Sequence, residues 1–188
     1  MEHFYIAAIL FGLGLTCFAS FSWGVKGHFR STGKMPTGMK LVSLLSLLGF
    51  LSFTGRLITN GASGSTLLAL SFFVASLALF AWTIRATRQT PPTLAFDTDK
   101  PAFLLLHGPY QYVRHPFYLS YMLFWIGTAV AFAGALPWLT PLVMLLVYQQ
   151  AASREERKFA NSDFSIAYAD YQRRAGMFVP RANAILHG

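Results

Sequence analysis

Residues 107–118 read HGPYQYVRHPFY and stand immediately before a long apolar segment. Gly108 and Pro109 interrupt regular structure, and Pro116 can occupy the first turn of the helix that follows. Arg114 and His115 are then polar groups placed where that helix leaves water. The stretch therefore predicts a ligand site at a membrane surface, joined to a buried helix, and the rest of the chain can be interpreted around it.

The composition favours a membrane protein. Of the 188 residues, 54% are hydrophobic, only 12% are charged and 18 are Phe, which is more apolar surface than a soluble domain of this size normally buries. Several apolar runs approach the ~20 residues that a spanning helix needs. We expect one all-α integral membrane domain over residues 1–188, with three spans in residues 1–86 and a loop, a helical hairpin and a C-terminal helix in residues 87–188.

Five apolar runs are the expected transmembrane helices. They cover residues 4–25, 41–58, 66–84, 117–135 and 139–151. The N-terminus lacks the basic region of a secretory signal, so we expect the first run to stay in the mature protein as a span. The fifth run is short for a full span, and the tight turn at residues 136–138 makes it the second arm of a hairpin.

The basic residues predict the orientation of these spans. The loop after the first span, the loop before the fourth and the tail after the fifth carry 14 of the 15 Lys and Arg residues. Because such residues collect on the cytoplasmic side, we expect a multi-pass protein with its N-terminus outside and its tail in the cytoplasm. The opening motif then lies on the cytoplasmic side as well.

Several classes of function find no support in the sequence. The net charge of +8 is spread over loops between apolar runs, which suggests anionic membrane lipids rather than nucleic acid. All seven acids lie outside the five runs, so no intramembrane ion path is indicated. Cys17 is the single cysteine, and His107 and His115 have no matching ligands nearby, so we expect no disulfide and no metal. A Gly-x-Ser-x-Gly nucleophile motif is also absent.

The tail predicts a second structured element beside the opening motif. Residues 154–158 read REERK and continue the fifth helix into water, after which Ser162 or Asp163 can cap a further helix. An aromatic face on that helix is formed by Phe164, Tyr168 and Tyr171. We expect this amphipathic cytoplasmic helix to dock on the protein, the alternative being that it rests on lipid headgroups.

Taken singly, the polar residues of these two segments have ordinary explanations. Tyr110, Tyr112 and Tyr118 are also typical of the aromatic belt at a membrane surface, and Arg114 can snorkel toward water. Glu155 and Glu156 can form pairs with neighbouring basic residues on a solvated helix end. Their order along the chain is more specific than any one of them.

That order resembles a known superfamily over residues 103–180. GPYQYVRHPFY is followed, after one apolar hairpin, by Glu155-Glu156 and then by the aromatic and basic residues of the tail, ending at Phe178-Val179-Pro180. This arrangement resembles the integral membrane methyltransferases typified by isoprenylcysteine carboxyl methyltransferase and phospholipid N-methyltransferase.

The resemblance implies that S-adenosyl-L-methionine binds between the loop and the tail. The residues that it places around this cofactor are Leu104, Leu105, Tyr110, His115, Pro116, Phe117, Tyr118, Glu155 and Glu156. A carboxylate suits the ammonium or ribose hydroxyls of the cofactor, and aromatic faces tolerate a sulfonium. No catalytic residue is assigned, and the candidates for positioning the reactants are Arg114, Arg154 and Arg174.

The methyl acceptor stays open at this stage. The carboxyl methyltransferases carry an Arg about one turn before the acidic pair, where this chain has Ala152 or its neighbours Gln149 and Gln150. They also place a His upstream, where Ala102 stands. A lipophilic acceptor of the isoprenylcysteine, lipid amine or thiol kind is therefore expected. Two other functions stay open. One is an NADPH-dependent lipid or sterol-type reductase, although such enzymes usually show Asn-Pro in place of His115-Pro116. The other is a non-enzymatic membrane scaffold.

Overall fold

The computed structural model describes residues 2–30, 34–96 and 101–181. Within these ranges the chain is helical, and its only β-type pairings are two isolated bridges, Arg30 with Thr93 and Val113 with Gly176. The helices are α1 Glu2–Gly27, α2 Thr37–Asn60, α3 Thr66–Ala86, the short η1 Gly108–Gln111, α4 Pro116–Val130, the short η2 Leu136–Trp138, α5 Leu139–Ala160 and α6 Ser165–Arg174. The all-helical fold expected from the sequence is confirmed for this part of the chain.

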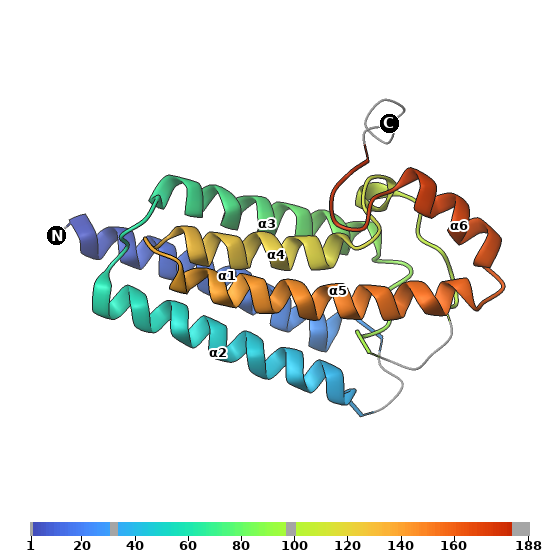
Figure 1. Ribbon diagram of the computed structural model, residues 1–188, viewed down its shortest axis with the longest axis horizontal. Coiled ribbons are helices and arrows are strands. Elements are labelled where there is room, and N and C mark those ends of the chain that lie inside the picture. Colours follow the sequence, from blue (N-terminus) through green and yellow to red (C-terminus); the bar gives the residue numbers. More distant parts are fainter. Residues whose placement is uncertain (1, 31–33, 97–100, 182–188) are drawn as a thin grey trace.

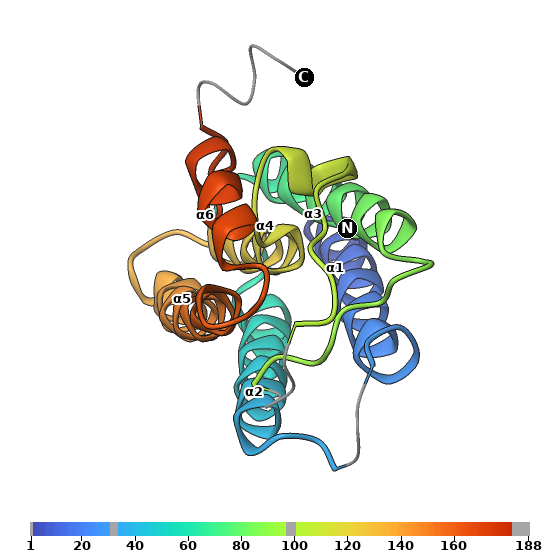
Figure 2. The same cartoon turned by 90° about the vertical axis from the view of Figure 1, so that its right-hand side faces the viewer.

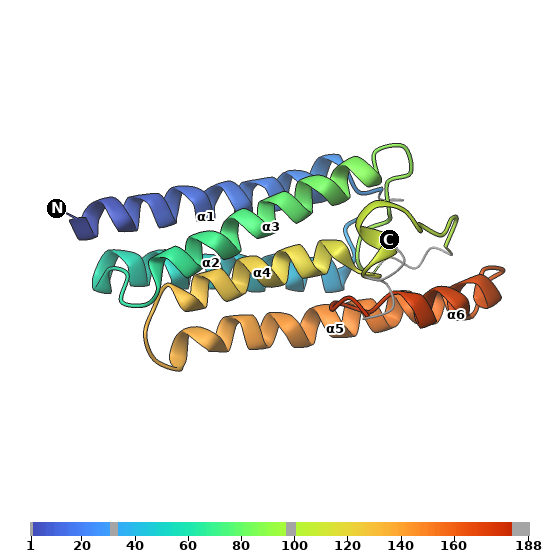
Figure 3. The ribbon, with the colours of Figure 1, turned by 90° about the horizontal axis from the view of Figure 1, so that it is seen from above.

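The five longest helices lie roughly side by side and alternate in direction along the chain (Figures 1 and 3). As a result, the segments that follow α1 and α3, the start of α4 and the end of α5 all gather at one end of the bundle. The short helix α6 crosses that end beside the loop that precedes α4 (Figure 2). The opening motif and the tail, which are far apart in sequence, are thereby brought together.

Among the described residues, three helices are long and apolar enough to cross a membrane: Phe4–Gly27, Thr37–Asn60 and Thr66–Ala86. Large apolar side chains are exposed on their outer faces, including Ile58 at 79% and Leu67 at 82%. Such exposure suits lipid rather than water. The α4–α5 hairpin completes the bundle, but α4 has only 15 residues and α5 ends in polar turns.

The interior is built mainly from aromatic side chains on α2, α3 and α4. Phe73 and Phe124 are fully buried, and their ring centroids lie 5.6 Å apart. The Ser76 hydroxyl donates a 2.7 Å hydrogen bond to the carbonyl of Ser120, which ties α3 to α4. In an apolar environment such an interhelical hydrogen bond and close packing replace the hydrophobic driving force.

Helix α4 ends at Val130 and is therefore shorter than the apolar run of residues 117–135 predicts. The carbonyls of Val130 and Ala131 accept hydrogen bonds from the backbone of Ser65 and Gly64, at 3.1 and 3.0 Å. These contacts satisfy the end of the helix and turn the chain away. Gly64 is required there, since a Cβ would lie 2.2 Å from the Val130 oxygen.

The tail confirms the prediction of a continued fifth helix and a docked sixth one. Helix α5 runs through the polar REERK segment to Ala160, and the next turn is held by a 3.2 Å hydrogen bond from the Phe164 amide to the Ser162 hydroxyl. Tyr168 and Tyr171 on α6 are buried at 3% and 4% exposure. The helix therefore packs on the protein with its aromatic face.

Candidate functional site

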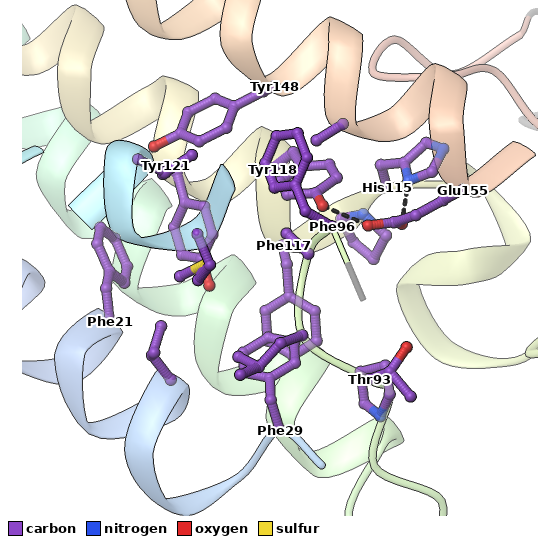
Figure 4. Close-up of a pocket in the computed structure, with 18 of the residues that line it drawn as sticks. Phe21, Phe29, Thr93, Phe96, His115, Phe117, Tyr118, Tyr121, Tyr148 and Glu155 are labelled. Atoms are coloured by element: carbon purple, nitrogen blue, oxygen red, sulfur yellow. Dashed lines mark hydrogen bonds and ion pairs between the residues drawn. The ribbon is translucent and has the colours of Figure 1, made fainter. Parts of the chain in front are cut away.

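A cavity of about 500 Å³ opens at the end of the bundle where the opening motif and the tail meet. Its walls come from α1, α2, α4 and α5, with the segment before η1 and two tyrosines of α6 closing the outer end. Figure 4 shows the side chains of Phe21, Tyr121 and Tyr148 on one side of the cavity, and the Tyr118 hydroxyl pointing to Glu155 on another. This volume is within the usual ~300–1,000 Å³ of small-molecule sites.

Most of the residues expected at a cofactor site line this cavity. They are Leu104, Leu105, Tyr110, His115, Pro116, Phe117, Tyr118 and Glu155, together with Arg114. Glu156 is not on the lining. Arg154 and Arg174 are exposed and also lie off the lining; the Arg154 guanidinium instead sits 5.3 Å from the centre of the Phe96 ring.

Glu156 forms the centre of a polar cluster that fixes the tail to the motif. Its Oε1 accepts hydrogen bonds from Arg114 Nε at 2.8 Å and lies 2.8 Å from Arg114 Nη2 and 3.1 Å from His115 Nε2. Its Oε2 accepts from Gln172 of α6 at 2.9 Å. Both oxygens are thus engaged within the protein, so Glu156 has a positioning part in this arrangement.

The charges of this cluster stabilise one another. Burial alone would raise the pKa of Glu156, but the hydrogen bonds from His115 and Arg114 outweigh it and lower the pKa from 4.5 to about 2. Burial alone would lower the pKa of His115, but its hydrogen bonds to Glu155 and Glu156 raise it above 6.5. The imidazole is therefore biased toward its cationic form beside two carboxylates.

Glu155 is the carboxylate that faces the cavity. Its Oε1 accepts a hydrogen bond from the Tyr118 hydroxyl, and its Oε2 lies 3.5 Å from His115 Nδ1. About a third of its side chain remains exposed, at 32%. Glu155 therefore has capacity for a further donor that Glu156 lacks.

An aromatic series leads from these acids into the bundle. The His115 and Tyr118 rings stack at 5.6 Å between centroids, and the Tyr118 and Tyr148 rings stack at 5.5 Å. Tyr121 packs against both Tyr148 and Phe21, at 5.7 and 4.6 Å. The cavity is consequently charged near Glu155 and aromatic farther in.

Backbone and side-chain contacts close the outer end between loop and tail. The Tyr171 hydroxyl donates a 2.7 Å hydrogen bond to the carbonyl of Tyr110, and burial raises the pKa of both phenols above their ordinary value. The Gly176 amide donates to Tyr112 O at 3.1 Å, and the Arg114 amide donates to Gly176 O at 2.7 Å. The split site is therefore assembled by direct hydrogen bonds.

His107 lies apart from this site. Its Nε2 donates a 2.8 Å hydrogen bond to the carbonyl of Ala86, at the end of α3. It anchors the loop to α3 instead of facing the acids. Arg173 of α6 is likewise outside the site: it is exposed and pairs with Asp170 on its own helix.

The sequence reasoning missed the contribution of α2 to the cavity. Met39, Val42, Ser43 and Ser46 line it and recur at helical spacing on one face of α2. The helical spacing of Ser43 and Ser46, next to Met39 and Val42, is the sequence signal that could have identified this face. Lys26 on α1 also lines the cavity and was counted only as a loop charge.

A comparison with known families bears on what such a cavity does. The family model described as phospholipid methyltransferase matches residues 62–166, more than half of the chain. The chain belongs to the phospholipid methyltransferase family. The matched range contains the opening motif, the α4–α5 hairpin and both acids, and so includes the α4 and α5 walls of the cavity but not those from α1 and α2. No curated protein matches the chain significantly.

Family membership makes this chain a membrane methyltransferase. It supports that function over the reductase and the scaffold that the sequence left open, and it agrees with the three long apolar helices. The cavity joins the two halves that the family motif separates in sequence.

Proposed function

We propose that this protein transfers a methyl group from S-adenosyl-L-methionine to a lipophilic acceptor, with both reactants held in the cavity between the loop and the tail. The observation that carries this proposal is the polarity of the cavity. Glu155 and His115 mark its outer end, while Phe21, Tyr121 and Tyr148 line its inner end. A water-soluble donor and a membrane-soluble acceptor need such opposite surroundings.

The outer end fits the donor. Glu155 has a free edge for an ammonium or for ribose hydroxyls, and the backbone groups of Leu104 and Leu105 make no hydrogen bond to any other described residue, so they are available to an adenine ring. Arg114 and His115 are already committed to the acids. Lys26 is therefore the better partner for the carboxylate of the donor.

When bound, S-adenosyl-L-methionine would supply an electrophilic methyl group attached to a sulfonium. The protein then aligns the two reactants and excludes water from the site. The tyrosine rings of the lining, Tyr118 and Tyr121, offer aromatic faces to a cation, and the contacts of Tyr171 and Gly176 with the loop hold the outer wall in place. Alignment of two reactants in a closed site accounts for a large part of such catalysis.

The membrane topology follows the same proposal. The loops and the tail that carry most of the basic residues lie at the end of the bundle that holds the cavity (Figure 1). We place this end in the cytoplasm, where the donor is made available, with the N-terminus outside. The α4–α5 hairpin then supplies the fourth and fifth spans.

Calorimetry with S-adenosylhomocysteine on the purified full chain tests the donor site. We expect saturable binding by the parent protein and a roughly 10- to 100-fold weaker Kd in Glu155→Gln, because a charge-assisted hydrogen bond is lost. Asp163→Asn is the matched control, since it neutralises an exposed tail carboxylate away from the cavity. Absence of binding by the parent, or equal binding by Glu155→Gln and the control, would refute the assignment.

A further inference from the structure

The inner end of the cavity has a chemistry of its own. Helix α5 contributes Tyr148 there, seven residues before Glu155 and therefore about 10 Å deeper along the helix. Trp125 of α4 and Ser46 of α2 line the same level. Apart from its aromatic faces, this end carries hydroxyl groups.

These hydroxyl groups include an O–H donor without a protein acceptor. The Tyr148 oxygen accepts a 3.1 Å hydrogen bond from Trp125 Nε1 and also interacts with the Ser46 hydroxyl. Whichever way the contact between the two hydroxyls points, two O–H groups meet in one bond, so one O–H is left over. Tyr148 is 4% exposed, and a buried donor without a partner is costly.

Tyr121 adds a second donor beside this pair. Its ring lies 5.7 Å from that of Tyr148, and within the described ranges its hydroxyl has no hydrogen-bond partner. The side chain lines the cavity. At least two O–H groups therefore face a space with no protein acceptor for them.

The inner end has no charged group to neutralise a charged ligand. Among the described lining residues, the ionisable groups with ordinary charge at neutral pH are Lys26, Arg114, His115 and Glu155, and all of them belong to the outer end. Burial of an ion without a partner is strongly unfavourable. The groups that remain are donors, and an ammonium offers no acceptor to them.

We propose that the hydroxyls of Tyr121 and Tyr148, supported by Ser46, form a binding site for an uncharged hydrogen-bond-accepting group of the acceptor, such as a carbonyl, ether or alcohol oxygen on an apolar chain. That the bound molecule is the methyl acceptor rests on the proposed function, but the binding site itself is defined by these side chains. It selects oxygenated neutral lipids over hydrocarbons and over lipids with a cationic group at this depth.

Competition between three probes of equal chain length tests the site without any methyl donor. Native mass spectrometry of the detergent-purified full chain measures bound 2-tetradecanone, tetradecane and tetradecyltrimethylammonium at equal concentrations. We expect the ketone to be preferred about 10- to 100-fold over both, which is the effect of two hydrogen bonds. Tyr148→Phe and Tyr121→Phe should each reduce this preference about three- to tenfold, which is the effect of one hydrogen bond.

The controls separate a lost hydrogen bond from a damaged fold. Tyr121→Phe leaves no protein group unpaired, whereas Tyr148→Phe also frees Trp125 Nε1, so the first variant carries the test if the second is unstable. Tyr5→Phe is the matched control, because Tyr5 is 60% exposed near the start of α1. It should leave the preference unchanged.

Two results would overturn the inference: a parent protein that prefers the ammonium or the hydrocarbon, or a ketone preference that survives Tyr121→Phe and the double Tyr121→Phe, Tyr148→Phe variant. Its failure is distinguishable from failure of the proposed function. Calorimetry with S-adenosylhomocysteine reports only on the outer end of the cavity. Ketone selectivity without S-adenosylhomocysteine binding would therefore refute the proposed donor site but support the oxygen-binding site. S-adenosylhomocysteine binding without ketone selectivity would support the donor site and refute the oxygen-binding site.

Discussion

Glu156→Gln should release α6 from the loop before α4, because this substitution copies the protonated acid. The carboxylate of Glu156 joins Arg114 and His115 of the loop to Gln172 of α6. Its pKa is lowered from 4.5 to about 2, and a pKa difference of about 2.5 corresponds to about 3 kcal/mol in favour of the ionised form. Gln keeps the shape but loses that preference.

Hydrogen exchange of backbone amides measures the effect. The amides of Arg114 and Gly176, which donate to Gly176 O and Tyr112 O, report on docking of the tail. A loss of about 3 kcal/mol predicts roughly 100-fold faster exchange through local opening. The amides in the middle of α3 should exchange as in the parent protein, since the bundle does not depend on this cluster.

Glu155→Gln is the matched control for this experiment. Glu155 is the neighbouring acid on the same helix, and it contacts Tyr118 and His115 but no residue of α6. Its substitution should change tail exchange far less than Glu156→Gln does. If the two variants accelerate exchange equally, or if neither does, the division of the acids into a structural and a cavity-facing one is wrong.

Three further predictions follow from individual contacts. Because the pKa of Glu156 is depressed, its contribution to docking is complete above about pH 4.5 and is lost as the pH falls toward about 2; pH-dependent exchange of the Gly176 amide checks this, and a profile identical to that of Glu156→Gln would contradict it. Tyr171→Phe removes the hydrogen bond to Tyr110 O and should weaken docking by about 1 kcal/mol in the same measurement; unchanged exchange would show that the bond is not needed. Gly64→Ala drives a Cβ to 2.2 Å from the carbonyl oxygen of Val130, so we expect a loss of about 1–3 kcal/mol and a lower Tm in thermal unfolding, with exposed Gly12→Ala as the control.

The sequence was sufficient to predict the long helices and the part of the cavity wall that comes from the opening motif and Glu155. Apolar runs separated by Gly, Pro and basic residues located α1, α2 and α3 within a few residues of their observed bounds. The aromatic spacing of Tyr168 and Tyr171 predicted which face of α6 is buried. These features are local, because hydrophobic periodicity and turn residues act over a few neighbouring positions.

Contacts between distant segments were beyond such reasoning. The end of α4 at Val130 depends on hydrogen bonds from Gly64 and Ser65, which belong to the connection between α2 and α3. The cavity face of α2 depends on which side of that helix turns toward α4 and α5. An apolar helix that lines a cavity has the same composition as one that faces lipid, so only the packing distinguishes Ser43 and Ser46 from residues of an ordinary span.

The neighbouring acids Glu155 and Glu156 lie on different faces of α5. Successive residues on an α-helix point about 100° apart, and here Glu155 lines the cavity while Glu156 does not. Tyr148, Ala151, Glu155 and Phe159 all line it, which are positions of one face of α5. Glu156 falls on the adjacent face, against Arg114. The two neighbouring acids therefore have different surroundings: Glu155 lines the cavity, and Glu156 joins the loop before α4 to α6.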